Sequence, residues 1–256
     1  MYKITLEALK KANNERLWFT TNLKLAKVYL DIKNFAELEN LLVQLKKSCQ
    51  LPDGTNDVTK GTYLLEVYCL EIQLCTLTQN SNRMRSIYPH TLNLNAAVSD
   101  PRIMGIIREE GGKMYLLEGL WLEAYNELFE AFRAYQQAGN TRAKICLKYV
   151  VLASMLALSD INPFSAREAK VYADDIEIIA MSDLRNCLEI NDLKKFEKII
   201  KDKRNKICDE PLLMTYIGSL RKRMREHVTD HSSSSSFPPS LSLINPVGSL
   251  EYLQTL

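Results

Sequence analysis

Metal-assisted hydrolysis is one chemistry that the histidines of this chain could support. Three histidines occur, His90, His227 and His231, and a spacing of four could place the last two on one helix face. A zinc hydrolase with that spacing needs a glutamate directly after the first histidine as general base. Val228 stands there instead, so we predict exposed histidines, no metal ligands and no bound cofactor.

Nucleophilic catalysis is the chemistry that the cysteines could offer. No two of the six are spaced as C-x-x-C, and no local signature of a Cys-His pair surrounds any of them. Cys69 and Cys146 fall on apolar positions of helical patterns. We therefore predict reduced, buried cysteines in an intracellular protein of the cytoplasm and nucleus. The six are Cys49, Cys69, Cys75, Cys146, Cys187 and Cys208.

Phosphate binding is excluded at the glycine pair Gly111–Gly112, because no G-K-[ST] follows it and no strand precedes it. With the metal and cysteine patterns also missing, we predict no catalytic residue and no enzymatic activity.

A basic segment is the remaining candidate for a binding site. Residues 194–225 contain 11 Lys/Arg and 4 Asp/Glu, a charge of +7 in a chain of net charge +2. The contact residues that we predict there are Lys194, Lys195, Lys198, Lys201, Lys203, Arg204, Arg221, Lys222, Arg223 and Arg225. A solvated helix face, a contact with an acidic protein or phosphate, and nucleic-acid binding all remain open. Aromatic residues among these cations are few, with Phe196 beside the first basic run, which disfavours stacking on single strands.

The elements that would carry these residues are helices. Apolar residues recur at spacings of three and four along most of the chain, as in Leu38, Leu41, Leu42 and Leu45. Glycine and proline are scarce, and no alternating strand pattern appears before residue 228. The sequence predicts an all-α fold that crosses no membrane, since no run of 18 apolar residues occurs.

Residues 111–139 carry the offsets of a tetratricopeptide (TPR) helix pair. Small residues at Gly112 and Ala124 would let two antiparallel helices approach closely, with Leu128 and Phe132 filling the space beside them. The predicted packing residues are Gly111, Gly112, Tyr115, Gly119, Ala124 and Ala131. A weaker match to the same pattern lies 86 residues earlier. Because 86 is not a multiple of the 34-residue TPR repeat, we expect irregular hairpin repeats.

Three segments follow from this pattern. We predict TPR-like repeats over residues 1–139 and a further helical domain over residues 140–227, whose last helix ends near His227. Residues 228–256 contain five consecutive serines and a Pro-Pro pair. This composition predicts a disordered tail.

Three stretches resemble a known family. They are residues 6–19 (LEALKKANNERLWF), residues 103–119 (IMGIIREEGGKMYLLEG) and residues 146–181, which contain INPF and EAKVYADDIEIIAM. Together they resemble the PCI family, whose helical subunits build the COP9 signalosome and, more distantly, the proteasome lid. The resemblance extends over residues 4–227.

The resemblance implies a right-handed superhelix of helical hairpins leading into a PCI module, which ends in a winged helix through which subunits assemble. It also implies a non-catalytic scaffold that supports removal of Nedd8 from cullins, a reaction run by a different subunit. The implied partners are other signalosome subunits and a cullin-RING ligase.

The sequence departs from this family at both ends. The acidic tail and first repeats of the family are absent, and TDHSSSSSFPPS follows Val228 where a winged helix is expected. We therefore expect a truncated, incomplete PCI domain. A nucleic-acid-binding PCI protein and a remnant with no assembly function remain the alternatives.

Overall fold

The computed structural model of the protein describes residues 14–94 and 100–233, with side chains described up to residue 226. The all-α prediction is confirmed: within those ranges every multi-residue element is a helix, and Gln50 and Asn56 form an isolated β-bridge in a loop. The α-helices are α2 (Glu15–Asp31), α3 (Phe35–Ser48), α4 (Gly61–Leu77), α5 (Ser81–Asn93), α6 (Pro101–Leu117), α7 (Trp121–Gln137), α8 (Arg142–Leu156), α9 (Ile176–Glu189), α10 (Leu193–Lys201) and α11 (Pro211–Ser233). The short 3-10 helices are η1 (Val58–Lys60), η3 (Pro163–Ser165), η4 (Ala169–Tyr172) and η5 (Lys203–Asn205).

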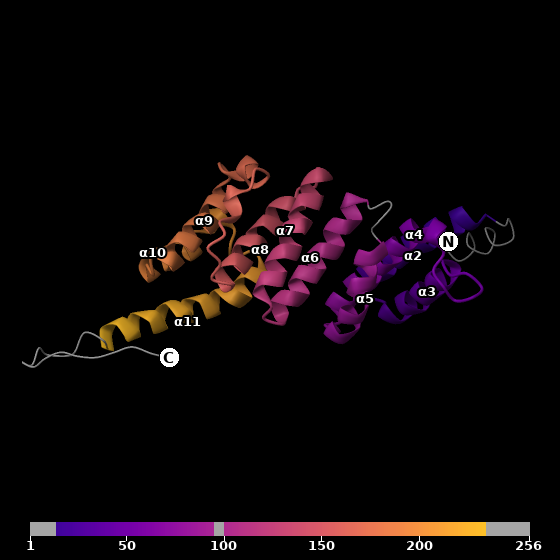
Figure 1. The fold of residues 1–256 in the computed structure, drawn as a ribbon, viewed down its shortest axis with the longest axis horizontal. Coiled ribbons are helices and arrows are strands. Elements are labelled where there is room, and N and C mark those ends of the chain that lie inside the picture. Colours follow the sequence, from indigo (N-terminus) through magenta and orange to yellow (C-terminus); the bar gives the residue numbers. More distant parts are fainter. Residues whose placement is uncertain (1–13, 95–99, 234–256) are drawn as a thin grey trace, which may run out of the picture.

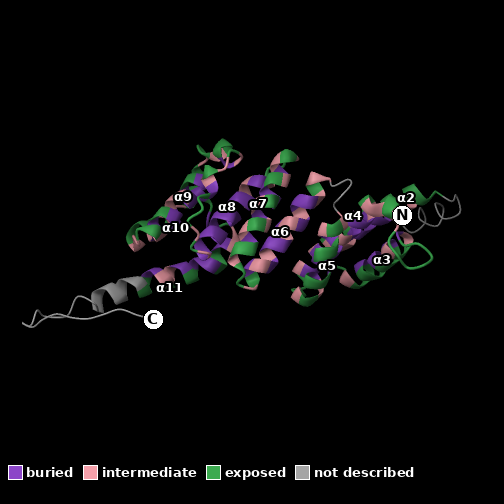
Figure 2. Cartoon of the chain, in the orientation of Figure 1, coloured by how far each residue is buried: buried purple, intermediate pink, exposed green. Residues whose placement is uncertain are grey.

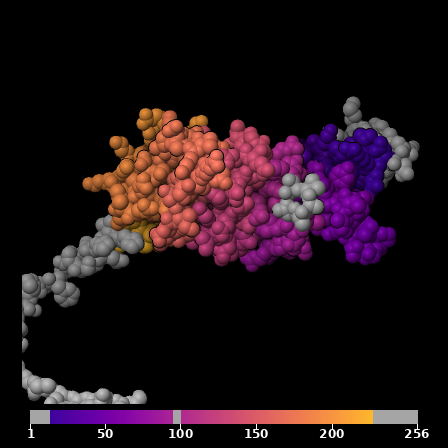
Figure 3. Space-filling model, turned by 45° about the horizontal axis from the view of Figure 1, so that its top comes forward, coloured from indigo at the N-terminus to yellow at the C-terminus, as the bar shows by residue number. Residues whose placement is uncertain are grey.

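The helices stack in chain order into an elongated body. Figure 1 shows α2–α5 at one end, α6, α7 and α8 side by side in the middle, and α9 and α10 at the other end. The space-filling view keeps the same order along the molecule (Figure 3). Neighbours in the sequence are also neighbours in packing. None of the helices in the described ranges is long and apolar enough to span a membrane.

Helix α8 lies at the centre of the apolar core. Every residue from Cys146 to Leu156 is buried, and the helix is coloured as buried along almost its whole length in Figure 2. Its apolar residues cover all sides of the helix, which predicts an enclosed position. Because α7, α9 and α11 all pack on it, α8 joins the middle of the stack to its C-terminal end.

One turn geometry recurs between successive helices. The residue after the helix end adopts a left-handed conformation, and the next residue donates its N–H to a carbonyl five residues back, which is the Schellman motif. These pairs are Asn34 to Tyr29 (2.9 Å), Asn80 to Cys75 (2.9 Å), Leu120 to Tyr115 (3.0 Å), Asn140 to Tyr135 (2.9 Å) and Asp192 to Cys187 (2.9 Å). The donor residue also lies at the start of the next helix, so each turn reverses the chain within about three residues.

The side chains of these turns explain where the following helices begin. The side chains of Asn34, Asn80 and Asp192 accept hydrogen bonds from the first turn of the next helix. Asparagine and aspartate are favoured at this position because they satisfy an otherwise unpaired N–H group. A single short segment therefore ends one helix and starts the next.

The prediction that the last helix ends near His227 is wrong. Helix α11 continues to Ser233, because residues 227–233 (HVTDHSS) contain neither proline nor glycine to stop it. The first residues of the predicted tail are therefore helical. Residues 234–256 of that tail lie outside the described residues, as do residues 6–13 of the first stretch that resembles the PCI family.

Candidate functional site

Helix α6 presents glycines to helix α7. A Cβ atom on Gly112 would lie 2.5 Å from Cγ of Leu128, and one on Gly105 would lie 2.7 Å from Cδ1 of Tyr135. Both distances are far below van der Waals contact, so a larger residue would push the helices apart. The sequence analysis named Gly112 but missed Gly105. Their spacing of seven, two helical turns on one face, is the signal that could have found it.

Gly111 lies on a different face of α6, against helix α5. A Cβ atom there would overlap the ring of Tyr88. That ring is 1% exposed, its hydroxyl donates a hydrogen bond to Glu127, and Tyr115 packs edge-on against it at a centroid distance of 6.2 Å. Burial and the neighbouring carboxylate raise the pKa of the Tyr88 hydroxyl, so it stays protonated and donates.

The other predicted packing residues take two roles. Ala124 and Ala131 are completely buried on α7, where their small side chains lie in apolar clusters. Gly119 forms the turn between α6 and α7 with φ +76°, a conformation that glycine adopts without steric cost. The six predicted positions therefore all lie in or beside the joint between α5, α6 and α7.

A buried carboxylate links α6, α7 and α8. Glu109 is 1% exposed and accepts hydrogen bonds from Nε and Nη2 of Arg142 at 2.6 Å each and from the hydroxyl of Tyr135 at 2.8 Å. Lys113 lies 2.7 Å away. Burial alone would raise the pKa of this carboxyl, but the hydrogen bonds from Arg142 and the charge of Lys113 lower it to about 2. Glu109 is therefore ionised and fully engaged.

Similar buried ion pairs occur at other helix joints. Glu71 of α4 is 2% exposed and contacts Lys46 of α3 and Arg83 of α5, the latter at 2.7 Å. Glu177 of α9 contacts the buried Lys148 of α8. Charged residues within apolar runs are the only sequence sign of these joints. They hold helices in place, and each of these carboxylates is paired with at least one cation.

The cysteines differ from the prediction at one position. Cys49, Cys69, Cys75, Cys146 and Cys187 are buried, whereas Cys208 is exposed. Cys208 follows the turn after η5, where the chain crosses the surface before α11, so helical periodicity does not apply to it. Burial raises the pKa of the Cys69 thiol to about 12, which leaves it a poor nucleophile at neutral pH.

His90 lies on a different helix from the other two histidines. His90 is exposed on α5, while His227 and His231 belong to α11 beyond the residues whose side chains are described. Within the described ranges, no three His, Cys, Asp or Glu side chains come together as metal ligands.

The ten predicted basic residues fall into two sets. One set is paired: Arg204 with Asp202 at 2.7 Å, Arg221 with Glu197, Lys195 with Asp183 at 3.7 Å and Lys222 with Glu226 at 3.8 Å, while Arg223 donates to the carbonyl of Met155 at 3.5 Å. The other set has no hydrogen bond or ion pair among the described residues, and comprises Lys194, Lys198, Lys201, Lys203 and Arg225. Positive charge without a partner is thus concentrated on α10 and the residues just after it.

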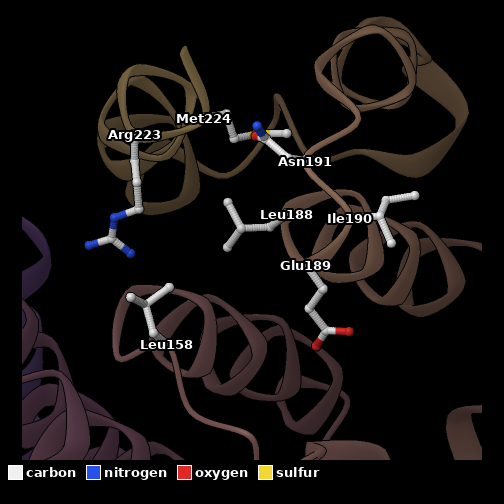
Figure 4. A pocket seen from close by; sticks show the side chains of 7 residues that line it. All are labelled: Leu158, Leu188, Glu189, Ile190, Asn191, Arg223 and Met224. Carbon is white, nitrogen blue, oxygen red and sulfur yellow. The ribbon is translucent and has the colours of Figure 1, made fainter. Parts of the chain in front are cut away.

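A hollow of about 430 Å³ lies where α8 and α9 end beside α11. Figure 4 shows the side chain of Leu188 pointing toward the space between Leu158 and Arg223. The carboxylate of Glu189 in its wall is paired with Arg185 at 3.0 Å. The hollow therefore offers no unpaired acid or base among its described residues.

These features define a class of protein: an all-α stack of helical hairpins whose joints are closed by small residues and buried ion pairs. No family model matches the chain. Its relatives are proteins named COP9 signalosome complex subunit 2. The chain is 47% identical to that of Dictyostelium discoideum over 228 residues, 45% identical to that of Drosophila melanogaster over 227 residues, and 38% identical to that of Schizosaccharomyces pombe over 230 residues.

Each of these matches covers 89% of this chain and 51% or 52% of the relative. The recognised resemblance to signalosome proteins is confirmed, and the chain is homologous to COP9 signalosome subunit 2. It spans about half the length of the curated relatives it matches.

Proposed function

We propose that this protein is a non-catalytic scaffold that takes part, through protein contacts, in a complex of the signalosome type. The observation that carries the proposal is its identity of 38–47% to signalosome subunit 2 over nearly nine tenths of its length. The partners that this likeness suggests are other signalosome subunits and a cullin-RING ligase. Its role would be to support cullin deneddylation in the cytoplasm and nucleus.

The construction of the stack supports a role in presenting a fixed shape. Helices α6, α7 and α8 are held by Glu109 and by the glycines of α6. A buried carboxylate that accepts several charged hydrogen bonds is costly to displace. Surfaces on opposite sides of this joint would therefore keep a constant spacing, which a scaffold requires.

Within this scaffold we propose that residues 1–139 are TPR-like repeats and residues 140–227 the helical part of a PCI domain. The proposed boundary falls in the turn between α7 and α8. One apolar cluster contains Phe132 and Tyr135 before that turn and Ala143 and Cys146 after it. The two segments would thus act as one continuous body.

Assembly is the property to test. The tagged full chain is co-expressed with the other signalosome subunits, purified by the tag and separated by size-exclusion chromatography. We expect the other subunits to co-elute with the chain, because the homologous segment would retain contact surfaces. An unrelated tagged helical protein is the control. Recovery of the folded chain alone would contradict the proposal and favour a remnant without assembly function.

A further inference from the structure

An open hollow of about 510 Å³ lies between α9 and α10, at the end of the stack. Its apolar lining comes from Ile176, Ile179 and Ala180 of α9 and Ile199 of α10. Figure 1 shows these two helices as the outermost pair beyond α8.

Two residues of the apolar lining are exposed. The side chain of Ile176 is 65% exposed and that of Ile179 is 44% exposed. These residues are three apart on α9 and so lie on one face of the helix. A second hollow of about 210 Å³, lined partly by Phe164 and Ala173, also contains Ile179. The two hollows share Ile179 and Asp183 as lining residues, and we call them together the α9–α10 groove.

The charged residues that line the hollow leave an excess of positive charge: Lys195, Lys198 and Lys201 against Asp183 and Asp202. Asp183 in its lining is paired with Lys195 at 3.7 Å, and Asp202 is paired with Arg204 at 2.7 Å. Lys198 and Lys201 also line the hollow, and no described carboxylate pairs with either of them. Elsewhere in the stack, cations such as Arg142 and Lys148 are neutralised by buried carboxylates.

We propose that the α9–α10 groove binds an acidic amphipathic helix of a partner protein. Apolar side chains at three- and four-residue spacing would pack on Ile176 and Ile179, as in other helix-in-groove complexes. Carboxylates flanking that apolar face would reach Lys198 and Lys201. The inference rests on the proposed scaffold function, because it assigns one contact surface to that scaffold.

The lining of the groove favours a protein over a nucleic acid. The apolar lining is mainly aliphatic, with Phe164 as the one aromatic residue among the lining residues described, whereas single-stranded nucleic acids are held by successive bases stacking on aromatic side chains. Covering exposed isoleucines also needs apolar groups, which a phosphate backbone lacks. Charge and apolar lining together therefore select an acidic, partly apolar ligand.

Fluorescence anisotropy with the full chain tests the proposal. The probe is a fluorescein-labelled helical peptide of about 18 residues, with leucines along one face and glutamates beside them. A control peptide of the same sequence carries lysines in place of the glutamates. We expect the acidic peptide alone to bind, with an affinity that falls as salt rises.

Two double variants with the same charge change locate the binding. Lys198→Glu combined with Lys201→Glu should weaken binding by about tenfold or more at low salt, because both rim charges reverse. Lys24→Glu combined with Lys47→Glu changes exposed lysines at the other end of the stack and should leave binding unchanged. Ile179→Ser should weaken binding at every salt concentration, since it removes apolar contact.

Several outcomes would overturn the proposal. The proposal is contradicted if both double variants weaken binding equally, if the lysine-containing control peptide binds as well as the acidic one, or if the acidic peptide does not bind. It is also contradicted if labelled single-stranded RNA binds tightly and this binding is lost when Lys198→Glu is combined with Lys201→Glu. Self-association of the chain that Lys198→Glu with Lys201→Glu abolishes would make a second copy the occupant instead. Failure to assemble with other subunits would count against the scaffold function only, because the peptide measurement does not depend on it.

Discussion

The α6–α7–α8 joint and the α9–α10 pair are built from the same kind of hairpin but are completed differently. In the first, glycines allow Leu128 and Tyr135 to pack directly against α6, and Glu109 accepts hydrogen bonds from Arg142 and Tyr135. In the second, Ile176 is largely exposed and Lys198 has no described partner. We call the first the closed joint, because its polar groups are paired and it stabilises the stack. We call the second the open pair, because an exposed isoleucine and a lysine without a described partner remain available for binding.

Removing the charge of Glu109 should have the largest effect. Glu109→Gln leaves the guanidinium of Arg142 without its carboxylate and leaves Lys113 paired with Glu110 alone, and we expect a loss of about 3–5 kcal/mol in unfolding free energy. Urea denaturation followed by circular dichroism measures it. Glu197→Gln, which removes the half-exposed partner of Arg221 in the open pair, is the matched control and should cost about 1 kcal/mol or less. Equal losses of unfolding free energy in the two variants would contradict the difference that we describe between the two regions.

Acid should selectively weaken the closed joint. The pKa of Glu109 is lowered to about 2 in the folded protein, from about 4.5 when unfolded, so its stabilisation is complete above pH 4.5. It is lost as the pH falls towards 2, and amounts to about 3 kcal/mol. Denaturation at pH 6, 4 and 3 should show this loss in the native protein. The Glu109→Gln variant should show a flatter profile; identical profiles would contradict the assignment.

Filling the space at Gly112 tests the close approach of α6 and α7. Gly112→Ala places a Cβ 2.5 Å from Cγ of Leu128 and 3.3 Å from its backbone nitrogen, so we expect a loss of about 2 kcal/mol from overpacking. The control is Gly218→Ala on α11, where a Cβ meets no atom within 4 Å. There, helix propensity alone should raise stability by about 0.5–1 kcal/mol. Thermal denaturation distinguishes the two signs.

The smallest effect on stability should come from the open pair. Ile176→Ser removes an apolar side chain that is 65% exposed, and we expect a change within about 0.5 kcal/mol. The same denaturation measurement checks it. A loss above about 2 kcal/mol would mean that Ile176 supports the fold and is not free for a partner.

Much of this fold follows from the sequence, because helix periodicity is a local property. The stripe of leucines in α3 and the continuously apolar α8 both predicted their helices and their burial. Gly112 was recognised from its place in a repeat pattern. Gly105 was missed although its spacing of seven from Gly112 places both on one helix face; that Tyr135 is the residue packed against it is known only from the folded pair.

The ion pairs and the groove depend on longer-range geometry. Glu109 meets Arg142 from 33 residues away, a separation at which the sequence gives no register. Counting lysines and arginines located the basic segment but not its pairing, which depends on which helix face each cation occupies. Residues such as Lys198 became distinct from Arg221 only when the partners of each were known.

The Schellman turns at Lys33 and Gln79, remote from the α9–α10 groove, could be made more stable without changing a binding surface. Both residues adopt left-handed conformations, and for a residue with a side chain such a conformation costs about 1 kcal/mol. A substitution that relieved this strain would strengthen the hairpins while leaving the groove and the buried ion pairs as they are. The rigidity of the scaffold and its choice of partner can therefore evolve, or be engineered, independently.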